Sequence, residues 1–413
     1  MTILRALRKI NLTTWIFIGI ACGVLTGSLI GEPALVIAGP LGDLFIRLLR
    51  MIIVPLIAAS LISGITSIGA GEDLGRLGWK TFVYYMSTSI SAIIVGMVIM
   101  NIVSPGFGVH MDLGEAPEAF TASKSVWDSV DGLILKMGPR DRLKAIADGD
   151  ILPLIFFCIL IGVFITRLPE KPRTLLTNIF SAFFQVMMKV THLVISVAPI
   201  GIFGLITKVV ATTGFELLGP LFIYFLCILG GLFIHAFITL PSLLKFVGRV
   251  NPVRHVKAMG PALLTAFSTA SSGATLPLTM ERVEKNAGVS NKVTSFVLPM
   301  GATINMDGTA LYEAAAVLFI AQTYGIHLDI VQQIIVVLTA LAASVATAAI
   351  PKASLATIPM IMAAIGVPFE GIAIIQVFDR ILDMCRTTVN VWSDSCGAVV
   401  IARTEGETPL ADK

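Results

Sequence analysis

Long apolar segments occupy most of this chain of 413 residues. Seven of them could cross a hydrocarbon core of roughly 30 Å as a helix, and they lie near residues 13–31, 44–69, 81–103, 151–167, 178–210, 217–246 and 368–402. The chain is 56% hydrophobic and 13% charged, with a mean hydropathy of +0.90, which is far outside the range of soluble domains. Because only helices and closed barrels satisfy their backbone inside a bilayer, we predict an all-α polytopic membrane protein.

Three further apolar regions are interrupted by small and polar residues. The interruptions are STASSGATLP (268–277), GATINMDG (301–308) and SVATAAIPKAS (344–354). Apolar runs of about 10–14 residues suit re-entrant segments better than full spans. Irregular backbone at membrane depth is tolerated only where it is buried in protein or lines a water-filled site. Ordinary helix kinks are the alternative, but three breaks followed by a charged helix favour two re-entrant helical hairpins, at 258–280 and 331–366.

The Lys and Arg residues predict the topology. If each hairpin enters and leaves on one side, eight transmembrane helices remain and both termini share a side. The opposite loops near 211–216, 324–330 and 366–370 carry no Lys or Arg, and the long loop 104–150, where basic residues are mixed with more numerous acids, is the exception. The amino end and the connections of the first side carry Arg5, Arg8, Lys9, Arg76, Lys80, Arg167, Lys171, Arg173, Arg249, Arg254, Lys257, Arg282, Lys285 and Lys292. Since basic loops face the cytoplasm, we expect both termini to be cytoplasmic. The two hairpins then open from opposite faces, as inverted repeats do around a site at mid-membrane.

The last apolar segment carries a stripe of six polar side chains. At about 100° per residue they fall within a sector roughly 100° wide. Charged groups in a membrane are costly unless they face a cavity, a partner or an ion. We therefore interpret the stripe as a binding face; its members are Asp379, Asp383, Arg386, Thr387, Asn390 and Asp394.

Three residues of the stripe match the groups of an acidic amino acid. Arg386 offers a planar fork for a carboxylate, Asp383 could receive an ammonium, and the Asn390 amide could donate to a second carboxylate. The alternative is a buried Arg–Asp ion pair that holds helices together. Asp379, with Arg380 beside it, would then be a support.

Oxygen-bearing residues around the second break suggest a cation site. Hard cations such as Na⁺ prefer oxygen ligands, and an unwound helix exposes backbone carbonyls. The segment GATINMDGT adds the side chains of Asn305 and Asp307 to Asp394 and Asn390 of the final helix. One face of the third span carries three hydroxyls that could approach the same carboxylate, although such hydroxyls more often bond to their own helix; they belong to Tyr85, Thr88 and Ser89.

The hairpin tips allow two interpretations. Residues 270–275 (ASSGAT) and 347–354 (TAAIPKAS) offer backbone N–H groups and hydroxyls that could cradle a carboxylate. Small residues also favour tight helix packing. Convergence of both tips on one site would favour binding.

Other classes of function find little support. No basic block or aromatic platform suggests nucleic acid as a partner, and the first apolar segment lacks a signal-peptide cleavage site. The cysteines are scattered through apolar segments, so we expect small core residues and no metal site or disulfide; they are Cys22, Cys158, Cys227, Cys385 and Cys396.

The motifs NMDGTALYEA (305–314), SSGATLP (271–277) and DRILDMCRTTVN (379–390) with Asp394 resemble those of the dicarboxylate/amino acid:cation symporter family. This family includes the excitatory amino acid transporters and their prokaryotic homologues, and the similarity runs from about residue 12 to residue 406. The resemblance implies a homotrimer of elevator-type transporters in a cell membrane; the short outer loop and compact tail suggest a prokaryotic inner membrane.

The resemblance also implies a division of the chain. Residues 1–76 would form scaffold helices 1 and 2, and residues 77–106 transport helix 3. Residues 107–212 would form the outer loop and scaffold helices 4 and 5, and residues 213–250 transport helix 6. The transport core would be 251–413, with hairpin 1, helix 7, hairpin 2 and helix 8.

Roles for single residues are implied as well. The substrate would be bound by Arg386, Asp383, Asn390, Thr387, Thr309, Ser271, Ser272, Ile350 and Ser354. A first sodium site would use Gly301, Asn305, Asn390 and Asp394. A second would use Thr303, Met306, Ser344, Val345 and Thr347. A third would use Tyr85, Thr88, Ser89, Asn305 and Asp307.

Three positions depart from part of the family. Glu313 is glutamine in some prokaryotic members and glutamate in the animal ones, where it is tied to proton and potassium coupling. The usual extra arginine is replaced by Ala270 and Met384. Lys352 stands where a small or amide residue is usual; it either replaces that arginine or, as we favour, reaches solvent.

We therefore predict an Na⁺-driven symporter of L-aspartate and/or L-glutamate, with H⁺ or K⁺ coupling open. A proton-coupled glutamate carrier would not need Asp394, and a C4-dicarboxylate carrier would have no use for Asp383. An aspartyl protease would need two facing carboxylates, but Arg386 would hold Asp383 ionised, so we expect no enzyme. An ion channel would favour rings of repeated charge, which the arginine amid the acids argues against.

Overall fold

The computed structural model describes residues 12–67, 72–107, 151–213, 218–346 and 354–410, and every regular element within these ranges is a helix. The predicted all-α class is thereby confirmed. In chain order the α-helices are α2 (Leu12–Ile30), α3 (Leu35–Ser67), α4 (Glu72–Val103), α7 (Ile151–Thr166), α8 (Glu170–Ser196), α9 (Ala198–Thr213), α10 (Leu218–Ile234), α11 (Leu240–Phe246), α12 (Pro252–Thr269), α13 (Ser272–Lys285), α14 (Asn291–Ile304), α15 (Asp307–Thr323), α16 (Ile330–Ala346), α17 (Ser354–Ile365) and α18 (Ile372–Thr404).

Five helical stretches in the described ranges are long and apolar enough to cross a bilayer: 32–63, 76–103, 170–196, 219–246 and 291–323. Shorter apolar helices cover 14–30, 157–166, 198–212 and 330–344. These lengths agree with a multi-pass membrane protein, and the count of eight spans stays a prediction. The basic residues at 1–11 and the outer loop residues 108–150 lie outside the described ranges.

One predicted segment, 178–210, is not a single helix. It contains most of α8 and α9, which meet at Val197. Pro199 lies in the first turn of α9 and has no N–H with which to continue the hydrogen bonds of α8. The chain therefore turns at this point.

Two of the three predicted interruptions fall within the described residues, and both are present. Ala270 ends α12 in the left-handed conformation (φ 49°), and the Ser271 side chain caps α13 by accepting from Ala274 N at 3.2 Å. Asn305 and Met306 separate α14 from α15 in non-helical conformations. Pro277 lies inside α13 and not at the break, so the turn is made by Ala270 and Ser271. Pro351 and the third break lie outside the described residues.

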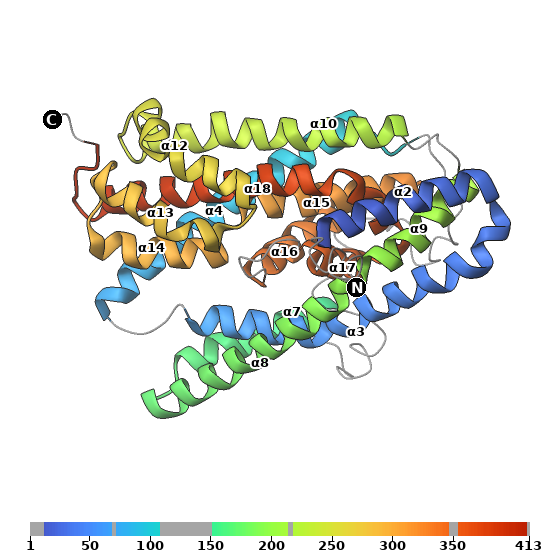
Figure 1. Ribbon diagram of the computed structural model, residues 1–413. Coiled ribbons are helices and arrows are strands. Elements are labelled where there is room, and N and C mark those ends of the chain that lie inside the picture. Colours follow the sequence, from blue (N-terminus) through green and yellow to red (C-terminus); the bar gives the residue numbers. More distant parts are fainter. Residues whose placement is uncertain (1–11, 68–71, 108–150, 214–217, 347–353, 411–413) are drawn as a thin grey trace, which may run out of the picture.

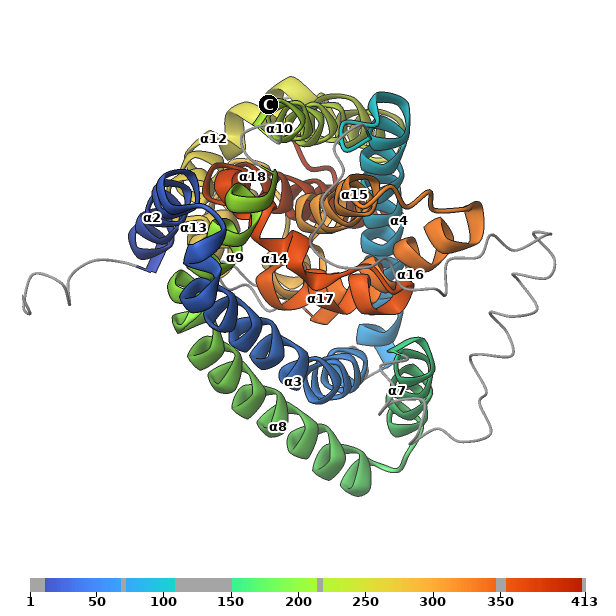
Figure 2. The same ribbon diagram turned by 90° about the vertical axis from the view of Figure 1, so that its right-hand side faces the viewer.

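The helices form an inner and an outer group (Figures 1 and 2). Helices α15 and α18 pack against each other near the centre, with α4 and α10 on one side and α14, α16 and α17 on others. Helices α3, α7 and α8 form an arc around this centre in the end-on view. Every residue of α15, from Asp307 to Thr323, is buried. A helix that is buried on all sides belongs to the interior of a bundle.

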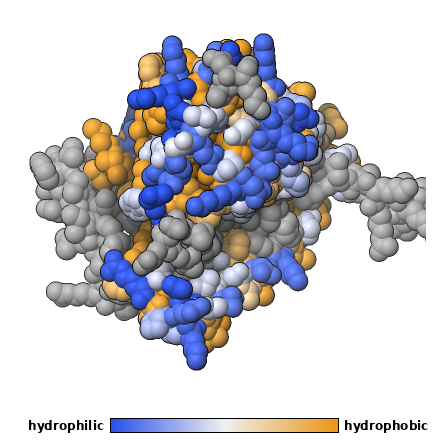
Figure 3. Space-filling model, turned by 90° about the vertical axis from the view of Figure 1, so that its left-hand side faces the viewer, coloured by the Kyte–Doolittle hydropathy of each residue, from blue (hydrophilic) through white to orange (hydrophobic). Residues whose placement is uncertain are grey.

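Hydrophilic residues gather at the end of the molecule where the C-terminus lies (Figure 3). Just beyond α18, Glu405 pairs with Arg76 and Lys80 of α4, each at 2.6 Å. Charged pairs at one end and apolar sides are the pattern of a bundle that enters water at its ends.

The cysteine prediction is partly wrong. Cys158, Cys227 and Cys396 are buried and Cys385 is half-buried, but Cys22 of α2 is exposed. A small apolar side chain on a membrane helix needs no protein core, because lipid solvates it equally well. All five thiols are free.

Candidate functional site

The polar stripe of α18 faces the interior of the bundle, as predicted. All six of its members are buried: Asp379, Asp383, Arg386, Thr387, Asn390 and Asp394. Arg386 is among the largest fully buried side chains of the described residues, with 1% of its surface exposed.

Arg386 uses only part of its hydrogen-bonding capacity. Its Nη2 donates to Asp379 Oδ1 at 3.1 Å and to Asp383 Oδ1 at 3.0 Å. Its guanidinium carbon lies 3.8 Å from the centre of the Tyr312 ring, whose hydroxyl donates to Asp379 Oδ1 at 3.2 Å. Arg386 Nε and Nη1 are buried without a hydrogen-bond partner, and so is Asp383 Oδ2. Buried charged groups rarely remain unpaired, so these atoms point to a ligand.

The buried Arg–Asp ion pairs that the alternative expected are present, but all three residues belong to α18, and the link to another helix is the Tyr312 hydroxyl of α15, which donates to Asp379. Asp379 does act as a support, through Arg386 and not through Arg380. Arg380 Nη1 lies 4.0 Å from Asp383 Oδ2 and is partly exposed. The carboxylates therefore orient the guanidinium and leave part of it open to an anion.

The start of α15 packs closely against α18 beside this arginine. Gly308 N donates to Asn390 Oδ1 at 2.8 Å, and Asn390 Nδ2 donates to Thr309 Oγ1 at 3.1 Å. A Cβ on Gly308 would lie 2.6 Å from the Arg386 carbonyl oxygen, so only glycine permits this approach. The structure thus brings together three residues predicted to bind substrate: Arg386, Asn390 and Thr309.

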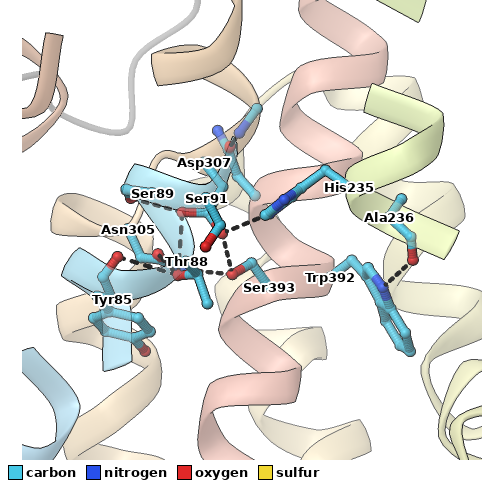
Figure 4. Close-up of polar contacts among 12 residues, drawn as sticks. Tyr85, Thr88, Ser89, Ser91, His235, Ala236, Asn305, Asp307, Trp392 and Ser393 are labelled. Carbon is cyan, nitrogen blue, oxygen red and sulfur yellow. Dashed lines mark hydrogen bonds and ion pairs between the residues drawn. The ribbon is translucent and has the colours of Figure 1, made fainter. Parts of the chain in front are cut away.

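Asp307 stands at the centre of a second polar group (Figure 4). Its Oδ1 accepts from Ser89 Oγ at 2.6 Å and from Thr88 Oγ1 at 3.3 Å. Its Oδ2 accepts from Ser393 Oγ at 2.6 Å and lies 3.1 Å from His235 Nε2. The predicted approach of the α4 hydroxyls to this carboxylate is confirmed for Thr88 and Ser89.

The Tyr85 hydroxyl instead donates to the carbonyl of Val297 in α14, at 2.9 Å. The Tyr85 carbonyl oxygen, 3.1 Å from Thr88 Oγ1, is an alternative acceptor for the single hydrogen of that hydroxyl. Tyr85 therefore takes part in this group through its backbone, where a carbonyl oxygen lies beside the Thr88 hydroxyl.

Asn305 connects Asp307 to the second carboxylate, Asp394. Its Nδ2 donates to Asp394 Oδ1 at 2.8 Å and to Ser393 Oγ at 3.0 Å. A Cβ on Gly301 would lie 2.5 Å from both Asp394 Oδ1 and the Tyr85 hydroxyl. Carboxylate, hydroxyl and carbonyl oxygens suit a hard cation, so the oxygens gathered around Asp307 and Asp394 have the chemistry of a cation site. The Asn390 side chain of the first predicted site bonds to Gly308 and Thr309 instead.

The second predicted sodium group is not assembled by the described contacts. Thr303 is exposed and bonds to the Pro299 and Met300 carbonyls of its own helix, and Ser344 bonds to Leu341 O. Met306 Sδ instead lies 3.4 Å from Asn390 Nδ2. Val345 belongs to α16, and Thr347 lies outside the described residues.

The structure describes some of the residues that were predicted at the hairpin tips. Ser271 caps α13, and Ser272 Oγ donates to Ala302 O of α14 at 3.2 Å. Ser354 is buried at the start of α17. Ile350 and Lys352 lie outside the described residues, so convergence of the two tips stays a prediction.

Glu313 is fully buried on α15. Its Oε1 accepts a hydrogen bond from the Thr357 hydroxyl of α17, and its Oε2 has no hydrogen-bond partner. A carboxyl group in this setting could hold a proton on Oε2, as the sequence suggested.

Sequence reasoning missed His235, Ser393 and Thr357. At about 100° per residue, Ser393 lies roughly 20° from Arg386 around α18, at the edge of the polar stripe, so a wider stripe would have included it. His235 is a lone histidine in an apolar segment, and only the fold places it beside Asp307.

Comparisons with known proteins agree with this geometry. A proton/sodium-glutamate symport protein of Geobacillus stearothermophilus is 36% identical over 407 residues, which cover 97% of this chain and 96% of the relative. The proton/glutamate-aspartate symporter of Escherichia coli (strain K12) is 36% identical over 410 residues, covering 96% and 93%. Human excitatory amino acid transporter 3 is 34% identical over 413 residues, covering 88% and 78%.

The sequence profile of the sodium:dicarboxylate symporter family matches residues 12–404, which include all of the polar groups described above. The families and relatives found are transporters and not enzymes. This chain belongs to the sodium:dicarboxylate symporter family.

Proposed function

We propose that this protein is a symporter that imports L-aspartate and/or L-glutamate together with Na⁺. One observation carries the proposal. Arg386 is buried with no hydrogen-bond partner at Nε and Nη1, and the neighbouring Asp383 accepts no hydrogen bond at Oδ2, which has only the Arg380 guanidinium at 4.0 Å. An acidic amino acid supplies what these atoms lack, because its carboxylate accepts from Arg386 and its ammonium donates to Asp383.

The sodium ions would act before the substrate. Asp307 and Asp394 are two buried carboxylates joined through Asn305. Buried negative charges repel an anionic solute, and cations bound at their oxygens would remove that repulsion. Cation binding would also order Asn305 and the start of α15, which contacts Asn390 of the substrate group.

We assign the helices to two units. Helices α4 and α10 to α18 would form a moving transport unit, and α2, α3, α7, α8 and α9 a scaffold. The protein would work as a homotrimer in the inner membrane of a prokaryotic cell, with both termini in the cytoplasm. The hairpins of α12 with α13 and of α16 with α17 would gate the site during elevator motion.

A proton-coupled variant of the same transport is the second candidate. Glu313 supports it, because this fully buried carboxyl group leaves Oε2 without a partner, and the bacterial relatives carry "proton" in their names. A C4-dicarboxylate carrier has less support, because such a substrate offers no ammonium to Asp383.

Purified protein in liposomes tests these alternatives. Uptake of radiolabelled aspartate and glutamate is measured with an imposed Na⁺, H⁺ or K⁺ gradient, one at a time, and with unlabelled succinate as competitor. We expect uptake to follow the Na⁺ gradient and succinate to compete poorly. Uptake that follows the H⁺ gradient alone, and that Glu313→Gln abolishes while Glu284→Gln does not, would establish the second candidate instead.

A further inference from the structure

Ser393 is a buried hydroxyl between the two carboxylates, and neither the sequence motifs nor the substrate groups account for it. Its single hydrogen is donated to Asp307 Oδ2 at 2.6 Å, so its oxygen accepts from Asn305 Nδ2 at 3.0 Å. The same Asn305 nitrogen donates to Asp394 Oδ1 at 2.8 Å. The hydroxyl therefore completes a chain of hydrogen bonds from one carboxylate to the other. Figure 4 labels Asp307, Ser393 and Asn305 of this chain.

The two oxygens of Asp307 have different surroundings. Oδ1 faces Thr88 and Ser89, whose hydroxyls can turn their hydrogens away and present lone pairs to a cation. Oδ2 faces Ser393 and His235, which can keep donating while an ion comes and goes. One oxygen is thus free to exchange a donor for an ion, and the other is anchored.

His235 is held in place by a local change of helix type. Residues His235–Thr239 form a π-helical turn between α10 and α11, and such turns are common at functional sites. The Trp392 indole nitrogen of α18 donates to Ala236 O at 3.0 Å. His235 Nδ1 is buried without a partner, so the hydrogen of a neutral imidazole lies on Nε2, toward Asp307.

We propose that Ser393 is a positioning residue that couples the two cation sites, with His235 as the second anchor of Asp307. This inference rests on the proposed sodium symport. A cation at Asp394 fixes Asn305, and Asn305 fixes Asp307 through Ser393. The second cation then enters a site that is already ordered, which makes binding cooperative.

The test measures binding without transport. The full-length protein is purified in detergent without amino acid, and its thermal unfolding midpoint is followed during a Na⁺ titration at constant ionic strength with choline chloride. Wild type, Ser393→Ala and Ser395→Ala are compared. Ser395 is a matched control, because it is equally buried on α18 but bonds to Trp392 O and His255.

We expect Ser393→Ala to raise the half-saturating Na⁺ concentration about tenfold, as expected for losing a hydrogen bond to a charged group, and to lower the Hill coefficient toward one. Ser395→Ala should match wild type. If Ser393→Ala does not fold, Ser393→Cys, which has a similar size and a weak donor, takes its place with the same expectation.

Each other result is decisive. If the Na⁺ titration of a Ser393 variant equals that of wild type, the coupling is refuted. Tighter Na⁺ binding by the variant also refutes it, because Ser393 would then only reduce the negative charge that Asp307 offers to the ion. If Na⁺ does not stabilise wild type at all, the proposed sodium symport itself fails, and the coupling fails with it.

Discussion

Tyr312 of α15 covers the guanidinium of Arg386, with 3.8 Å between the ring centre and the guanidinium carbon. A cation over an aromatic face in a desolvated site gains about 2 kcal/mol. The ring covers one face of the guanidinium, and one of its nitrogens, Nη2, donates hydrogen bonds to both Asp379 and Asp383. Nε and Nη1 keep their N–H groups free of hydrogen bonds, so these are the donors that an anion can still reach.

Replacing Arg386 by cysteine should abolish the uptake of acidic amino acids, because no other described side chain offers a buried fork at this place. Asp383 is still present to receive the ammonium of a neutral amino acid, so we expect uptake of radiolabelled serine to appear while glutamate uptake disappears. Arg386→Lys keeps the charge without the fork and should retain at most a few per cent of glutamate uptake. Glutamate affinity equal to that of wild type in Arg386→Cys would refute the assignment.

Asp394→Asn should weaken sodium dependence. The amide keeps the size of the side chain but removes a charge that faces Gly301 and Asn305. We expect the Na⁺ concentration for half-maximal uptake to rise at least about tenfold, the effect of losing one charge-assisted contact. Asp329→Asn is the control, because the Asp329 carboxylate accepts from Gln332 N at the exposed start of α16, away from the site. An unchanged sodium titration would remove Asp394 from the cation site.

Gly308→Ala should impair both folding and transport. Its Cβ would lie within 2.6 Å of the Arg386 carbonyl and 2.9 Å of the Arg386 Cα, both of which are backbone atoms that cannot move alone. Overpacking of this kind costs typically about 1–3 kcal/mol. Gly260→Ala in α12 has nothing within 4 Å of the new atom and should be neutral or slightly stabilising. The thermal unfolding midpoints of both variants are measured. A lower midpoint for Gly308→Ala alone indicates a packing clash at Arg386, and a lower midpoint for both variants indicates a general effect of alanine.

Glu405→Gln should lower stability in a pH-dependent way. Hydrogen bonds from Lys80 and Arg76 hold the pKa of Glu405 below its usual value. A lowered folded-state pKa adds stability above the unfolded pKa of about 4.3, and this stability is lost as the pH falls through the folded pKa. We expect Glu405→Gln to be less stable than wild type at about pH 7, by at most about 1 kcal/mol, the size of exposed ion pairs.

The difference between Glu405→Gln and wild type should shrink as the pH falls below the unfolded pKa of about 4.3, and it should vanish once the pH is below the lowered folded pKa of Glu405. Glu281→Gln is the matched control, because Glu281 makes a single exposed i,i+4 pair with Lys285 at 3.1 Å. A Glu405 effect that persists unchanged in acid would mean that the side chain stabilises the protein by packing and not by charge.

Much of the site could be predicted because its residues follow one another on regular elements. The stripe of α18 is a consequence of helical periodicity, and the break at Asn305 and Met306 follows from a run of small and polar residues in an apolar region. Both are local properties of the sequence, so the placement of Arg386 and Asp394 toward the interior needed no knowledge of the neighbouring helices.

What could not be predicted depends on contacts between distant segments. His235 lies beside Asp307 of α15 at the start of a π-helical turn, and such a short turn leaves no clear pattern in an apolar sequence. The hydrogen-bond partners of Arg386 could not be predicted from the sequence either. Periodicity places Asp379 and Asp383 on its face, but it does not say that both bond to the same nitrogen and leave Nε and Nη1 unused.

The burial of α15 along its whole length limits how this protein can move. A helix enclosed by neighbours at every turn has no free side along which to slide, and its first residues are joined to α4 through Asp307 and to α18 through Gly308. Moving α15 by itself would break all of these hydrogen bonds at the same time. In the proposed transport cycle, α4, α15 and α18 would therefore move together, as a single block.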